Sequence, residues 1–100
     1  MTPIRQVGHT EDGKPVMAGV GVMMTTHGVP LEVVLSGFKE RGWVCDWFDY
    51  VATCLNDGHK PNTIMSRVSA ACADVYGPVY TKAVVDRLEN KLSPGDISGA

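Results

Sequence analysis

RGWVCDWFDY (residues 41–50) places four aromatic side chains and two aspartates in ten positions. Gly42 is suited to end one helix, and Asp46 is suited to cap the next, which we expect over residues 46–57. Most apolar side chains of this second helix and its approach fall on one arc, which we predict to face the core: Val44, Trp47, Phe48, Val51 and Leu55. The stretch therefore predicts a helix boundary and an aromatic anchor for the core.

The opposite arc of the 46–57 helix is acidic, with Tyr50 on the border between the two arcs. Carboxylates in a first turn are stabilised by the helix dipole, so a capped and solvated face accounts for Asp46 and Asp49 without a partner. Aromatic residues beside acidic ones also form binding hot spots for basic surfaces. The partner-binding residues predicted on that second interpretation are Trp43, Asp46, Asp49, Tyr50 and Asp57.

On the N-terminal side of this stretch, the sequence predicts a helix over 30–41. Pro30 suits its first turn, and its buried face is predicted to hold Leu31, Val34, Leu35 and Phe38. On the C-terminal side, Asn62 is the predicted cap of a helix that continues to Val75. Gly77-Pro78 then ends that helix and begins a last one, whose buried stripe is Tyr80, Val84, Leu88 and Leu92.

The N-terminal segment leaves two interpretations open for residues 4–20. Val16, Val20, Met23 and Met24 recur at helical spacing, which favours a helix over 15–27, although Gly19 and Gly21 weaken it. Alternatively, Asp12-Gly13 closes a hairpin between IRQVGHT and PVMAGVGV.

These elements predict one all-α domain of four or five helices with short connections. The 100-residue chain divides into an N-terminal arm over 1–14, which is either irregular or part of a β-hairpin, a helical domain over 15–92 and a disordered tail over 93–100.

The composition is that of a globular protein with a net charge of -2, and this argues against a surface that works mainly by neutralising phosphates. Residues 29–58 hold two basic and five acidic side chains, so an acidic region is present. Three cysteines cannot all pair within one chain, which favours reduced thiols. With no signal peptide apparent and an apolar run at 16–24 about half the length of a bilayer span, we predict a cytoplasmic protein without a membrane partner.

No catalytic or cofactor motif is recognisable. Cys45, Cys54 and His59 lack the paired spacing and fourth ligand of a structural zinc site, and GVGVMM lacks the full glycine pattern of a phosphate-binding loop. We therefore expect no enzyme activity, no metal and no cofactor.

Residues 16–41 resemble a helix-turn-helix DNA-binding motif, with Gly28 in the turn. The resemblance covers about a quarter of the chain and departs from the motif at His27 and Gly37. It implies a DNA-binding regulator whose second helix presents Ser36, Lys39 and Arg41 to the duplex.

The favoured hypothesis is a small protein that acts by occupying a surface of another macromolecule. Its size and acidic segment fit an adaptor or inhibitor that covers a basic or nucleic-acid-binding surface of a host protein, as phage and mobile-element inhibitors do. Self-association through Met17, Met23 and Met24 is a further expectation, since methionines adapt to irregular interfaces.

Overall fold

The protein combines three short β-strands with five α-helices in the computed structural model, which describes residues 3–92. In chain order the elements are β1 (Arg5–His9), β2 (Pro15–Ala18), α1 (Val20–Thr25), α2 (Leu31–Arg41), β3 (Val44–Cys45), α3 (Trp47–Asn56), α4 (Pro61–Tyr76) and α5 (Pro78–Leu92). The predicted disordered tail over 93–100 lies outside the described residues.

The all-α prediction is wrong in one respect, because three short strands within residues 5–45 form a small sheet. Strand β2 pairs antiparallel with β1 and parallel with β3, where Val16 lies opposite Val44 and Met17 opposite Cys45. The helix expected over 15–27 is therefore limited to α1, and residues 15–18 are a strand. Pairing with residues 44–45 is a contact between distant parts of the sequence, so local periodicity could not reveal it.

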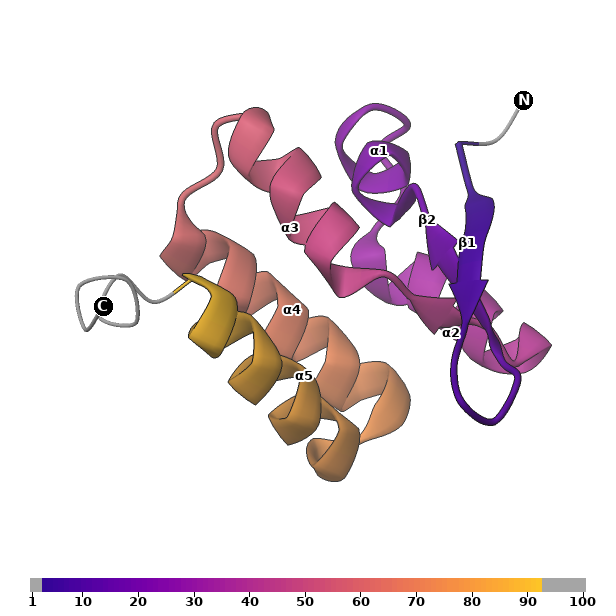
Figure 1. Cartoon of the computed structure of the whole chain (residues 1–100). Coiled ribbons are helices and arrows are strands. Elements are labelled where there is room, and N and C mark those ends of the chain that lie inside the picture. The colour runs from indigo at the N-terminus through magenta and orange to yellow at the C-terminus, as the bar shows by residue number, and fades with distance from the viewer. Residues whose placement is uncertain (1–2, 93–100) are drawn as a thin grey trace.

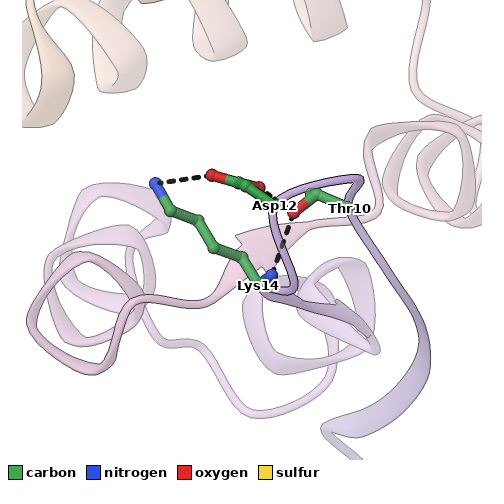
Figure 2. A network of polar contacts seen from close by, with 3 residues as sticks. All are labelled: Thr10, Asp12 and Lys14. Atoms are coloured by element: carbon green, nitrogen blue, oxygen red, sulfur yellow. Dashed lines mark hydrogen bonds and ion pairs between the residues drawn. The ribbon is translucent and has the colours of Figure 1, made fainter.

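The hairpin alternative is confirmed, and Figure 2 shows the polar contacts of its turn. The Thr10 hydroxyl donates to the Asp12 carboxylate and accepts a hydrogen bond from the Lys14 backbone N–H at 3.0 Å. The Lys14 ammonium lies 4.0 Å from the other Asp12 oxygen. The hydrogen bond from Thr10 lowers the pKa of Asp12. Gly13 supplies the positive φ, 86°, that the turn requires.

The chain turns from β2 into α1 at Gly19. Its φ is 102°, a conformation that L side chains rarely adopt. A Cβ placed on Gly19 would lie 2.3 Å from the carbonyl oxygen of Pro3, so a larger residue would also clash with the N-terminal segment. Both constraints require glycine at this corner.

Helices α2, α3 and α5 match the predicted segments closely. Gly42, with φ 72°, ends α2, and Asp46 caps α3, as expected. The predicted cap Asn62 is wrong by two positions: Lys60 is the N-cap, and Pro61 occupies the first position of α4, where its missing N–H is tolerated.

The core lies where the five helices of the described residues meet. Figure 1 shows α4 and α5 side by side, with α3 between α1 and this pair. Helix α2 packs on α4, and α1 packs on α3. The largest completely buried side chains come from these contacts: Val20, Leu31, Leu35, Tyr50, Cys54, Ile64, Val68, Cys72 and Leu88.

We expect Gly19→Ala to destabilise the protein more than Gly13→Ala, measured as the free energy of unfolding in urea. Both glycines have positive φ, so each substitution costs about 1–2 kcal/mol of backbone strain. A Cβ on Gly13 meets nothing within 4 Å, whereas one on Gly19 meets Pro3 and adds roughly 1–3 kcal/mol of overpacking. Equal losses for the two variants would contradict the described corner.

Candidate functional site

Asp46 forms the junction between the sheet and α3. Its backbone N–H donates to the carbonyl oxygen of Met17 at 2.9 Å, which extends the pairing of β2 with β3 by one residue. Its carboxylate accepts a hydrogen bond from the N–H of Asp49 at 3.2 Å, and this caps α3. Asp46 is half-buried and lines a groove described below.

Asp49 ties α3 to the corner of the chain at Gly19. Its carboxylate accepts the Gly19 backbone N–H at 2.9 Å, across thirty positions of sequence. Gly19 is buried, and this bond satisfies an N–H at the beginning of α1 that has no partner within the helix. Asp49 therefore has a structural role that the sequence pattern did not reveal.

Tyr50 does not lie on the surface, contrary to the prediction for a partner-binding residue. Its exposed fraction is 0%, and its hydroxyl contacts the sulfur of Met24 at 3.4 Å. Burial raises the pKa of Tyr50 well above its usual value, which keeps the phenol neutral.

The reason is that α1 covers this side of α3. A Cβ on Gly21 would lie 2.7 Å from the Cβ of Thr53, so α1 approaches α3 as closely as a glycine allows. The face of α3 that was expected to pack in the core therefore differs from the face that is buried. Phe48 and Leu55, expected in the core, are 42% and 40% exposed.

The two remaining predicted partner-binding residues, Trp43 and Asp57, lie on either side of α3 in the chain. Trp43 is half-buried between α2 and β3, with its ring edge-on to Phe38 at 5.5 Å between centroids. Asp57 is exposed beyond the last turn of α3 and lies 3.5 Å from the His59 ring. At 1.5 Å per residue, the length of α3 separates Asp46 from Asp57 by roughly 16 Å. The five residues do not form one patch.

A groove with a cavity volume of about 540 Å³ lies beside the exposed Phe48. We call it the α3–α5 groove. Its lining comes from the hairpin turn (9–11), from residue 16 of β2, from the β3–α3 junction (44–48) and from α5 (residues 80, 83, 84, 87 and 88). It thus joins three parts of the chain that are distant in sequence.

Paired side chains build the α3–α5 groove. The Trp47 indole N–H donates to the Tyr80 hydroxyl at 3.2 Å, which links α3 to α5. The guanidinium of Arg87 lies 5.6 Å from the centroid of the Phe48 ring, a cation–π distance. Burial raises the pKa of Tyr80, although the Trp47 hydrogen bond opposes this, so the hydroxyl remains protonated. Glu11 and Asp46 add two carboxylates to the same lining.

The three cysteines are buried within the core and have thiols with raised pKa values. Cys45, Cys54 and Cys72 are all buried and free, and burial raises the pKa of each thiol, that of Cys72 to about 11. A thiol that stays protonated is a poor nucleophile and a poor metal ligand. Between residues 3 and 92, no group of three or more His, Cys, Asp or Glu side chains is arranged to hold a metal ion.

Residues 16–41, which resemble a helix-turn-helix motif in sequence, have a different secondary structure from that motif. Residues 16–18 are strand, and the first helix has only six residues. Ser36 is exposed on α2, but Lys39 donates to the Val75 carbonyl at 3.0 Å, and Arg41 donates to the Gly37 carbonyl at 3.0 Å. Two of the three proposed DNA contacts therefore bind the protein itself.

The methionines proposed for self-association face inward to different degrees. Met17 is 7% exposed and belongs to the core, while Met23 and Met24 are half-buried and pack against it. The expectation of a shared methionine surface is therefore wrong for Met17.

We expect Asp49→Ala to lower the free energy of unfolding by about 1–3 kcal/mol, because the buried Gly19 N–H then lacks its acceptor. Asp49→Asn keeps an acceptor oxygen and should recover part of that loss. Asp57→Ala is the matched control on the exposed end of the same helix, with an expected change within about 0.5 kcal/mol. Urea unfolding of the three variants measures the effect, and equal midpoints for Asp49→Ala and Asp57→Ala would argue against the bond.

We also expect stability to fall as the pH rises above about 8.5, the usual pKa of a cysteine thiol in an unfolded chain. Above this pH the unfolded state loses thiol protons that the folded state retains up to about pH 11 at Cys72, so alkaline conditions favour unfolding. The urea midpoint under reducing conditions should be lower at pH 9.5 than at pH 7. A Cys72→Ala variant should show a shallower decline, and a midpoint that is independent of pH would contradict the buried thiols.

No family model, characterised protein or solved structure matches the chain, so hypotheses about its function depend on its own residues and geometry. No helix within residues 3–92 has the length and apolar character needed to cross a bilayer.

Proposed function

We propose that this protein binds another protein by occupancy, through the α3–α5 groove. The observation that carries the proposal is Phe48, a large apolar ring that is 42% exposed at a groove of about 540 Å³. Aromatic and arginine side chains that meet in a pocket are the usual anchors of protein interfaces, and here Trp47, Phe48 and Arg87 meet in this way.

The apolar surface continues along α3 beyond the groove. Phe48, Ala52 and Leu55 are all exposed and lie at positions i, i+4 and i+7, which share one helix face. A partner that packs on this face would remove about 25 cal/mol of unfavourable hydration per Å² of apolar surface. Exposure of a contiguous apolar stripe is typical of a binding surface.

The charges of the groove favour a partner with a basic segment. Glu11 lies in the hairpin turn and Asp46 at the start of α3, so carboxylates approach the groove from two elements. Arg87, the cation of the lining, already contacts the Phe48 ring. A lysine or arginine of a partner would find two acceptors beside an aromatic anchor.

An adaptor or an inhibitor, acting in the cytoplasm, fits these properties. Three free, buried thiols are compatible with a reducing compartment. Of the five partner-binding residues predicted from sequence, this interface keeps Asp46 and replaces the others with Phe48, Glu11 and Arg87. DNA binding stays a weaker hypothesis, because residues 16–18 are strand and the first helix of the expected motif has only six residues.

The experiment is affinity capture with the immobilised protein from nuclease-treated and untreated lysates of its host, followed by quantitative mass spectrometry. We expect a protein that is captured with or without nuclease and is lost with Phe48→Glu, which places a charge in the apolar anchor. Val33→Glu is the matched control: Val33 is 56% exposed on α2 and outside the groove, so this variant should capture the same protein.

Retention of every captured protein by Phe48→Glu would contradict the proposal. Capture that disappears after nuclease treatment would favour the DNA-binding alternative. Thermal unfolding of both variants confirms that each is folded.

A further inference from the structure

A second hollow lies on the other side of β3, and its lining is almost entirely apolar. We call it the α1–α2 pocket. It has a cavity volume of about 410 Å³, and its principal walls are Met17, Met23, Val29, Val33, Phe38 and Trp43. Arg41 is the one charged side chain in the described lining. The volume is within the range of small-molecule sites.

Arg41 is held in place at this pocket. Its Nη1 donates to the Gly37 carbonyl at 3.0 Å, and its guanidinium carbon lies 5.3 Å from the centroid of the Trp43 ring. A Cβ on Gly37 would lie 3.1 Å from the same nitrogen, so glycine makes room for the arginine to lie along α2. The cation is therefore positioned by contacts within the protein.

The charge of Arg41 is not neutralised within the part of the chain that the structure describes, where no carboxylate lies within 4.0 Å of it. A guanidinium has five N–H donors, and one is used by Gly37. The remaining donors match the two oxygens of a carboxylate.

We propose that the α1–α2 pocket binds a small amphipathic carboxylate, with its apolar chain against Met23, Val29 and Phe38 and its carboxylate on Arg41. A pocket of 410 Å³ holds the liquid volume of roughly fourteen waters. An unbranched carboxylate of about ten heavy atoms is compatible with this size. The proposal uses neither Phe48 nor the α3–α5 groove, so it is independent of the proposed partner.

Octanoate is a suitable probe, titrated into the ¹⁵N-labelled full chain below the concentration at which it forms micelles. We expect saturable shifts of the Trp43 indole and the Gly37 amide, because both border Arg41. The Trp47 indole, which donates to Tyr80 in the other groove, should stay unchanged. Octanol and octylammonium have the same chain without a negative charge, so each should bind about tenfold more weakly or worse.

Variants distinguish the contribution of the Arg41 charge to octanoate binding from that of the apolar walls. Arg41→Gln should weaken octanoate binding about tenfold or more, while Arg41→Lys, which keeps the charge, should lose less. Val33→Glu places a carboxylate at the pocket and should abolish binding, whereas Phe48→Glu should bind octanoate normally. The proposal is wrong if octanol binds as tightly as octanoate, if Arg41→Gln binds like the unmodified protein, or if the shifts do not saturate.

Discussion

The hydrogen bond from the Gly19 backbone N–H to the Asp49 carboxylate joins the corner between β2 and α1 to the first turn of α3. On one side of it the chain turns from β2 into α1 with a φ that requires glycine. On the other, Asp46 caps α3 and continues the pairing of β2 with β3. These contacts set the rotation of α3 about its axis, and that rotation decides which of its aromatic side chains are buried.

The rotation of α3 about its axis determines which of its side chains form the surface. With α1 packed on Thr53 through Gly21, Tyr50 turns into the core and Phe48 turns toward solvent. The β3–α3 segment then separates two hollows of different chemistry. One has paired aromatic residues, carboxylates and Arg87, and the other has apolar walls with Arg41 alone.

The sequence predicted well what local chemistry controls. Pro30, Gly42, Asp46 and Gly77 mark helix boundaries through their own backbone preferences, and α2, α3, α4 and α5 lie close to the expected ranges. The hairpin was predicted only as an alternative, and β3 was not predicted, because the pairing of β2 with residues 44–45 leaves no local pattern. The apolar spacing of residues 16–24 crosses a strand, a glycine corner and a helix, so it imitated one continuous helix.

The candidate site was harder to predict for a related reason. A helical wheel ranks residues by their own polarity, but burial on α3 depends on what packs there, and α1 was not foreseen as its neighbour. The prediction consequently placed Phe48 in the core and Tyr50 at the surface, which is the reverse of their observed positions. Asp49 looked available for a partner because its acceptor role toward Gly19 spans thirty positions of sequence.

Amide hydrogen exchange at Gly19 tests the central contact most directly. If the Asp49 carboxylate holds this N–H within a buried corner, the Gly19 amide should exchange only with global unfolding, at a rate like that of core amides in α4. Fast exchange at Gly19, comparable to that of a solvent-exposed loop amide, would contradict the account.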